Sequence, residues 1–84
     1  MNAQTYMIKT AQIIDALTAD TGLVLMKMNC EEGQWRAELY KDGLDTNICF
    51  EPDVVEAMVP EDHVLTDSAE YKSVVRSINE RYQV

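Results

Sequence analysis

EEGQWRAELYKDG, residues 31–43, places one potential strand between two short turn signals. Glu32-Gly33 and Asp42-Gly43 both suit a two-residue hairpin loop, because a type I′ turn needs positive φ at both central positions. Each turn fixes how the strand before it pairs with the strand after it. The stretch therefore predicts a meander of three antiparallel strands, with Trp35 on the middle one.

The two turns also specify the register. Asp42-Gly43 pairs Trp35 with Phe50 and Tyr40 with Asp45, while Glu32-Gly33 pairs Cys30 with Trp35 and Met26 with Leu39. Strand side chains alternate between the two faces of a sheet, so both hairpins must agree on which residues lie inside. They agree on one inner face, which contains Val24, Met26, Met28, Cys30, Trp35, Ala37, Leu39, Thr46, Ile48 and Phe50.

The other face of the predicted sheet is mostly polar. Lys27, Glu38 and Asn47 form one row across its three strands, where opposite charges give weak support. Trp35 is expected to point into the core opposite Phe50, and the alternative is a partly exposed Trp35 in a binding pocket. The apolar residues expected on the polar face are Leu23, Leu25 and Tyr40.

A helix is predicted before the strands. Over residues 3–19, apolar side chains recur at spacings of three and four, which predicts an amphipathic helix, and Gly22 is placed for its left-handed C-terminal turn. The predicted stripe contains Ala3, Tyr6, Met7, Thr10, Ile13, Ile14 and Leu17.

Two helices are predicted after the strands. EPDVVEAMVP, residues 51–60, reads as a short helix with Pro52 in its first turn and Pro60 as its stop. Residues 67–84 read as the last helix, with Asp67 and Glu70 approximating a capping box. The apolar stripe of that helix contains Tyr71, Val74, Val75, Ile78 and Tyr82.

The predicted order α-β-β-β-α-α corresponds to an α+β two-layer sandwich, in which helices pack on one face of the meander. Its 84 residues fit one domain, 1–84. The longest apolar run is four residues, Leu23–Met26, so no membrane-spanning helix is expected. The first ten residues show no apolar core of a signal peptide, so a cytoplasmic location is expected.

Negative charge is concentrated in one part of the chain. The formal net charge is −8, and nine acidic residues fall between positions 42 and 70 without any Lys or Arg. The remaining residues carry six acids and seven bases, so they are nearly neutral. We expect these acids to bind a partner with a basic surface, where opposite charge speeds encounter. They are Asp42, Asp45, Glu51, Asp53, Glu56, Glu61, Asp62, Asp67 and Glu70.

The sequence contains no motif for a catalytic, cofactor or metal site. Cys30 and Cys49 are predicted on opposite faces of non-adjacent strands, so two free thiols are expected, with Cys30 in the core and Cys49 more accessible. His63 lies among acidic residues, but without the ligand spacing of zinc or calcium sites. We therefore expect a protein that is not an enzyme and that binds neither a cofactor nor a metal.

Direct binding to nucleic acid is not expected. The order α-β-β-β-α is shared with double-stranded-RNA-binding domains, which hold phosphate through basic residues near the last helix. In this chain the corresponding region carries Glu61, Asp62, Asp67 and Glu70, which repel phosphate. An acidic domain can instead occupy a protein surface meant for phosphate.

The leading functional hypothesis is a non-enzymatic inhibitor that docks on a nucleic-acid-handling protein. In size and charge the chain is similar to small acidic inhibitors made by phages, including anti-CRISPR, anti-restriction and other DNA-mimic proteins. An immunity protein or antitoxin for a basic nuclease is a close variant. The alternative is a structural or accessory protein that forms a homodimer through Leu23, Leu25 and Tyr40 or through the edge of the first strand.

Overall fold

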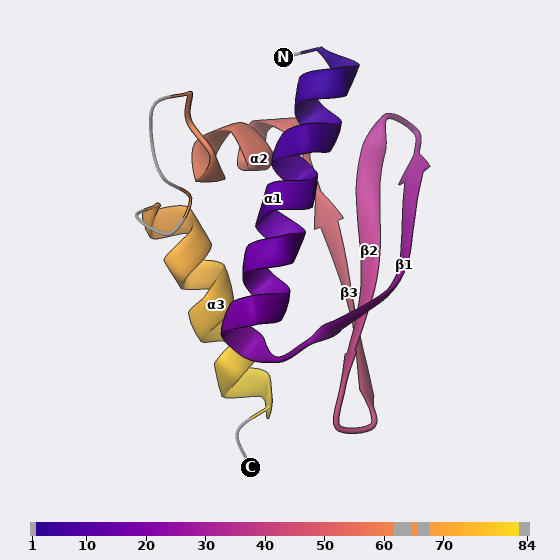
Figure 1. Cartoon of the computed structure of the whole chain (residues 1–84), viewed down its shortest axis with the longest axis vertical. Helices are drawn as coiled ribbons and strands as arrows, with labels where there is room; N and C mark the ends of the chain where they lie inside the picture. The colour runs from indigo at the N-terminus through magenta and orange to yellow at the C-terminus, as the bar shows by residue number, and fades with distance from the viewer. Residues whose placement is uncertain (1, 62–64, 66–67, 83–84) are drawn as a thin grey trace.

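The computed structural model describes residues 2–61, 65 and 68–82. The three strands form one antiparallel sheet in the order β1-β2-β3, and the helices lie on one side of it (Figure 1). The predicted α+β sandwich with the order α-β-β-β-α-α is thus confirmed. Its elements are α1 (Ala3–Thr21), β1 (Val24–Glu31), β2 (Gln34–Lys41), β3 (Leu44–Phe50), α2 (Pro52–Met58) and α3 (Ala69–Tyr82).

Both hairpin turns have the backbone geometry that the sequence predicts. Glu32 and Gly33 have φ values of 53° and 77°, and Asp42 and Gly43 have φ values of 53° and 85°. Positive φ at both central positions is the mark of a type I′ turn, which follows the right-handed twist of the flanking strands. The β2–β3 register is as predicted, from Lys41 opposite Leu44 to Trp35 opposite Phe50.

The β1–β2 register is as predicted from Glu31 back to Lys27, but not before it. Cys30 pairs with Trp35 and Met28 with Ala37, but Leu25, not Met26, pairs with Leu39. A β-bulge between Leu25 and Lys27 inserts one extra residue into β1. Because one extra residue reverses the alternation of side chains, all residues before the bulge change face.

The bulge overturns four predictions about the start of β1, one of which is that Leu25, expected on the polar face, lies opposite Leu39 on the inner side. Leu23 was expected on the polar face, but it is only 2% exposed and belongs to the core. Val24 and Met26 were expected inside, but they are 56% and 61% exposed. All four residues from Leu23 to Met26 are apolar, so hydrophobic alternation carries no information about the face there.

Polar groups cap both ends of α1. Asn2 Oδ1 accepts a hydrogen bond from the backbone N–H of Thr5 at 2.8 Å. Gly22 has φ 78°, and its N–H donates to the Thr18 carbonyl, which confirms the predicted left-handed end. Lys41 Nζ donates to the Thr21 carbonyl at 2.6 Å, a favourable position for a cation at a helix C-terminus.

The buried stripe of α1 differs from the prediction at its start. Tyr6, Thr10, Ile13, Ile14, Leu17 and Thr21 are buried. Ala3 and Met7 are exposed, so their assignment to the buried stripe is wrong. Ala3 and Met7 lie in the first two turns of the helix, where Tyr6 is the first buried residue.

The last helix begins one residue later than the predicted capping box implies. Ser68 Oγ accepts a hydrogen bond from the N–H of Tyr71 at 3.2 Å and donates to Glu70 Oε2, also at 3.2 Å. Ser68 therefore supplies the cap that was assigned to Asp67, which lies outside the described residues. At the other end, the side chain of Tyr82 is likewise outside what the structure describes.

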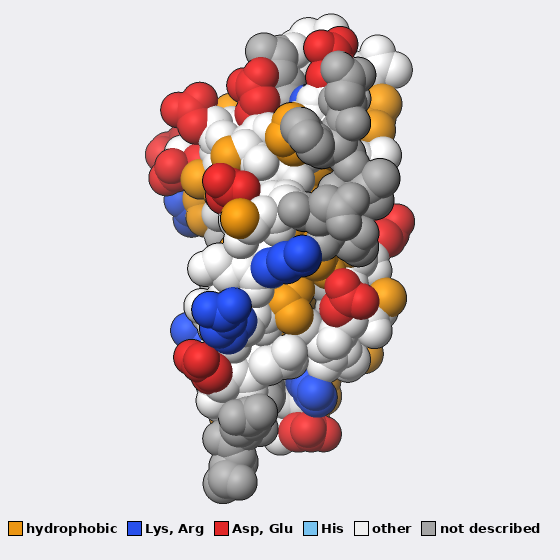
Figure 2. Space-filling view, turned by 90° about the vertical axis from the view of Figure 1, so that its left-hand side faces the viewer, with side chains coloured by type: hydrophobic (Ala, Val, Ile, Leu, Met, Phe, Trp, Pro, Cys, Tyr) orange, Lys and Arg blue, Asp and Glu red, His pale blue; other side chains and the backbone are white. Residues whose placement is uncertain are grey.

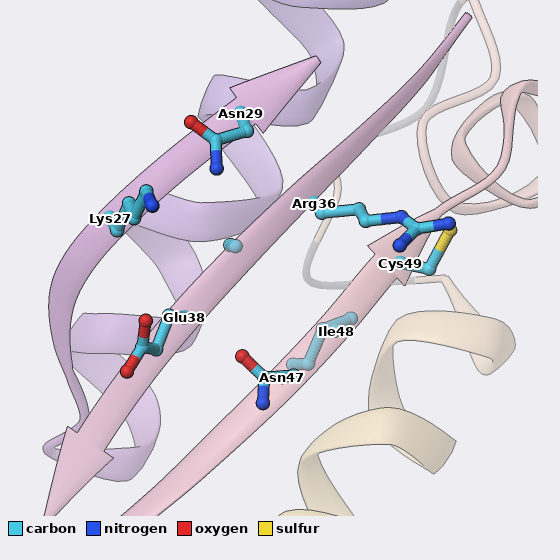
Figure 3. Close-up of a pocket in the computed structure, with 8 residues that line it drawn as sticks. Lys27, Asn29, Arg36, Glu38, Asn47, Ile48 and Cys49 are labelled. Atoms are coloured by element: carbon cyan, nitrogen blue, oxygen red, sulfur yellow. The ribbon is translucent and has the colours of Figure 1, made fainter. Parts of the chain in front are cut away.

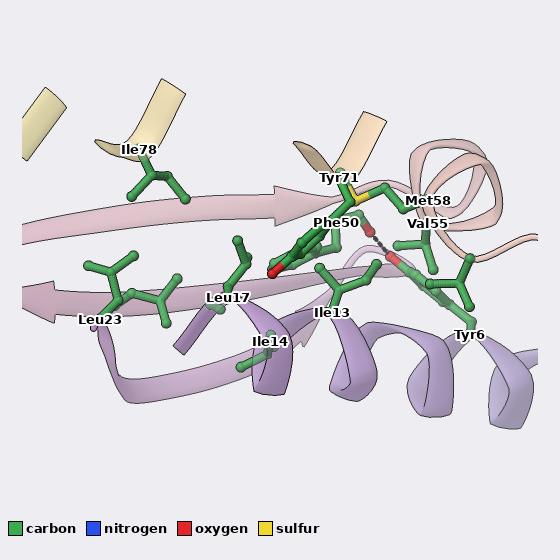
Figure 4. Close-up of a cluster of buried hydrophobic side chains, with 13 residues drawn as sticks. Tyr6, Ile13, Ile14, Leu17, Leu23, Phe50, Val55, Met58, Tyr71 and Ile78 are labelled. Atoms are coloured by element: carbon green, nitrogen blue, oxygen red, sulfur yellow. Dashed lines mark hydrogen bonds between the residues drawn. The ribbon is translucent and has the colours of Figure 1, made fainter. Parts of the chain in front are cut away.

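One core joins the inner face of the sheet to the three helices. Ile13 and Leu17 from α1, Leu39 and Phe50 from the sheet and Val55 from α2 are almost completely buried (Figure 4). Trp35 is partly buried and packs against this cluster, as the structural interpretation of its position predicted. Cys30, at the end of β1, is exposed, so its assignment to the core is wrong.

A tyrosine hydroxyl fastens α1 to the end of the sheet. Tyr6 Oη donates to the carbonyl of Phe50 and accepts from the N–H of Trp35 at 2.9 Å. Trp35 and Phe50 are cross-strand partners, so the hydroxyl lies between the two backbone groups that face each other. α1 is thereby hydrogen-bonded to the last residue pair of the β2–β3 ladder, Trp35 and Phe50.

A second tyrosine connects α3 to α1. Tyr71 Oη donates to Asp20 Oδ2 at 2.6 Å, and the Tyr71 side chain is buried. Burial is the main reason that the pKa of Tyr71 is raised well above its ordinary value, and the hydrogen bond to Asp20 and its negative charge add to the effect. The hydroxyl is thus held in its neutral, donating form.

Candidate functional site

The acidic residues between positions 42 and 70 do not form one surface. Asp42 and Asp45 lie at the β2–β3 turn, whereas Glu51 and Asp53 follow the far end of β3 (Figure 1). Five residues of β3, from Thr46 to Phe50, separate Asp45 from Glu51, a distance of about 20 Å along an extended strand.

The group at the far end of β3 is the larger one. Asp53 lies in the first turn of α2, where a carboxylate is favoured by the positive end of the helix dipole. Its members are exposed, and none of them forms an ion pair with a described residue. We call this group the α2 acidic surface, and it consists of Glu51, Asp53, Glu56 and Glu61.

One cation lies near the α2 acidic surface. Lys9 of α1 shares a shallow hollow of about 350 Å³ with Glu56 and Glu61. Figure 2 shows several acidic side chains gathered at the height of α2, while most of the visible Lys and Arg side chains lie lower, at the height of α3. On the face shown in Figure 2, negative charge is thus concentrated at the height of α2, while acidic and basic side chains are mixed lower down.

Three further acidic residues were predicted to belong to the binding surface, namely Asp62, Asp67 and Glu70. Asp62 and Asp67 lie outside the described residues, as does His63. Glu70 is described, and its carboxylate accepts from Ser68 Oγ at the start of α3. Its visible role is therefore in the cap of that helix.

The outer face of the sheet is a second candidate site. Lys27, Glu38 and Asn47 form the predicted row across the strands, since Lys27 pairs with Glu38 and Glu38 with Asn47. Asn29 and Arg36 lie in the next row, and the face forms an open hollow of about 400 Å³ (Figure 3). Charges of both signs and amides alternate here, so this face can hydrogen-bond to a polar surface but has no strong charge preference.

Both cysteines are free, as predicted. Cys49 is exposed on the outer face, where its Sγ lies 3.2 Å from Gln34 Oε1. Cys30 pairs with Trp35 and Cys49 with Arg36, so the two thiols project from opposite faces of the sheet.

The predicted apolar interface is rearranged by the β-bulge. Leu23 is buried and cannot contribute to it. Leu25 is 39% exposed but pairs with Leu39 of the inner face, so it projects away from Tyr40, which is 40% exposed. Tyr40 lies opposite Val24, and Met26 projects beside them. The sequence prediction missed Val24 and Met26, because it placed them inside a regular strand.

Within the described ranges, no group of three or more His, Cys, Asp or Glu side chains is arranged to hold a metal ion. None of the described helices is both long and apolar enough to cross a membrane.

Comparison of the chain with protein-family models, with curated proteins and with solved structures gives no match. The surface of this chain is thus the basis for its proposed function.

Proposed function

We propose that this protein is a non-enzymatic binding protein whose α2 acidic surface docks on a basic surface of a nucleic-acid-handling protein. The observation that supports this proposal is the exposure of four carboxylates at one end of the molecule, in a segment without Lys or Arg. The basic surface of a nucleic-acid-handling protein binds phosphate groups through Lys and Arg side chains. The carboxylates of the α2 acidic surface compete with phosphate for those side chains.

The activity that follows from this contact is inhibition of the partner, because the protein occupies the partner's basic surface. A partner whose basic surface is covered by this protein cannot hold nucleic acid there, and no bond has to be made or broken. This is the action of an anti-defence or DNA-mimic inhibitor made by a phage, and equally of an immunity protein that blocks a basic nuclease. The phage inhibitor and the immunity protein would use the same contact, and these two hypotheses differ only in the identity of the partner.

A capture experiment tests the proposal. The tagged protein is incubated with a bacterial cytosolic lysate treated with nuclease and washed at about 0.1 M or about 1 M salt, where the Debye length falls from about 10 to about 3 Å. We expect a basic nucleic-acid-binding protein to be retained at low salt and lost at high salt. Retention that is independent of salt, or capture of acidic proteins only, contradicts the proposal.

Self-association is the second candidate function. Val24 and Tyr40 lie opposite each other on the outer face, and with the exposed Met26 of the bulge they form an apolar patch beside the free edge of β1. Contacts between such patches persist at high salt, because they depend on burial of apolar area rather than on charge. A homodimer of the purified protein that is stable at about 1 M salt supports this second function.

A further inference from the structure

The outer edge of β3 is open to pairing. Tyr6 Oη bridges the N–H of Trp35 and the carbonyl of Phe50, so these two backbone groups face each other across β2 and β3. In an antiparallel pair the bonded positions alternate, which turns the backbone groups of Asn47 and Cys49 outward. Within the described part of the chain, no backbone hydrogen bond outside the β2–β3 pairing involves Asn47 or Cys49.

A groove runs along this open edge. It has a volume of about 320 Å³ and lies between β3 and α3, which packs against α1 and α2. Ser73 and Ser77, one turn apart on α3, line its helical side, and their small side chains leave the space beside the strand open. Val74 and Ile78 add apolar surface to the same wall.

The charge at the groove is opposite to that of the α2 acidic surface. Arg81 lines the groove and is exposed, and no described acidic side chain forms an ion pair with it. Lys72 and Arg76 lie on the same helix, one turn apart, and are also exposed. Glu80 is the one acidic residue in the second half of α3, so this helix presents a local excess of positive charge.

We propose that this groove takes an extended segment of a partner protein, which adds a strand beside β3 and places a carboxylate against Arg81. Pairing with Asn47 and Cys49 supplies main-chain hydrogen bonds, as in other cases of strand addition. Alternate apolar side chains of the segment face Val74 and Ile78, while the others face solvent. The site is separate from the α2 acidic surface and does not depend on the function proposed for it.

Two features favour a foreign segment on β3 over the other arrangements. The free edge of β1 contains a β-bulge, which disrupts pairing with a further strand, whereas β3 pairs with β2 in regular register. A second copy of the chain brings its own net charge of −8 to the contact. Electrostatic repulsion between two such copies opposes a dimer joined through β3. A short segment with one carboxylate has little net charge and is not repelled in this way.

The experiment uses a displayed library of random peptides of about ten residues, the upper range of strand length. Peptides selected on the intact protein are expected to combine alternating apolar residues with an acidic residue. Their binding is expected to slow amide hydrogen exchange at Asn47 and Cys49. Ser77→Tyr fills the groove from an exposed position of the helix and is expected to abolish binding, while Arg81→Glu weakens it about tenfold.

Glu80→Gln serves as the matched control on α3 and is expected to leave peptide affinity unchanged. Selection of no peptide, equal binding to the Ser77→Tyr variant, or protection of Asn47 that rises with protein concentration in the absence of peptide overturns the proposal. The last result indicates a β3-paired dimer. Capture of a basic protein through the α2 acidic surface is unaffected by Ser77→Tyr, so the two proposals fail independently.

Discussion

Reversal of Asp53, Glu56 and Glu61 to Lys is expected to weaken the complex with the captured basic partner by about thirtyfold. These three residues belong to the α2 acidic surface and are exposed. Each reversal replaces an attraction with a repulsion at a solvated contact, at about 0.7 kcal/mol per residue. Titration calorimetry of the purified complex at low salt measures the loss.

The matched control is the triple variant Asp15→Lys, Asp45→Lys and Glu80→Lys. It changes the net charge by the same amount, but its residues lie on α1, at the start of β3 and on α3, all of them exposed. We expect it to reduce affinity only through the general loss of negative charge, by about threefold or less. Equal losses in the two triple variants would show that total charge, not this surface, determines binding.

Substitution of Tyr6 by Phe is expected to destabilise the fold by about 2 kcal/mol, because it removes one hydroxyl that bonds to two buried backbone groups. The Trp35 N–H and the Phe50 carbonyl lose the group that bridges them. In a domain of this size the change corresponds to a fall in melting temperature of roughly 10 °C. Thermal and urea unfolding followed by circular dichroism measure both quantities.

Tyr40→Phe is the control for this substitution. Tyr40 is 40% exposed on the outer face of the sheet, where water replaces any partner of its hydroxyl. Its change is expected to be within about 0.5 kcal/mol of the parent. If the two variants have equal stabilities, the Tyr6 bridge has no part in holding α1 to the sheet.

Most of the fold follows from local signals in the sequence. The turns at Gly33 and Gly43 and the helix end at Gly22 each need a backbone conformation that few other residues adopt, and all three are where the sequence predicts them. Because a type I′ turn fixes register, one dipeptide, Asp42-Gly43, was sufficient to align β3 with β2 along its whole length.

The errors in the fold arise where the sequence is locally ambiguous. The start of β1 is apolar at every position, so the bulge at Met26 could not be distinguished from a regular strand. Cys30 was placed on the inner face correctly by alternation, but the core does not extend to the end of the strand. Alternation predicts the direction of a side chain, whereas burial depends on which helix covers it.

The candidate site was less predictable than the fold. The acidic segment is continuous in sequence, but β3 carries Asp45 and Glu51 to opposite ends of the sheet. The groove beside β3 could not be predicted either, because it depends on how far α3 lies from the strand edge. Both features are properties of packing between elements that are distant in sequence, and periodicity within one element does not report on them.

The most direct test of the proposed function is competition between this protein and nucleic acid for the captured partner. Fluorescence anisotropy of a labelled DNA duplex bound to the purified partner follows its release as this protein is added. We expect full displacement by the parent protein, displacement at similar concentration by the Asp15, Asp45 and Glu80 control, and little displacement by the Asp53, Glu56 and Glu61 variant. A stable ternary complex, in which the duplex stays bound while this protein binds the same partner, would contradict the account.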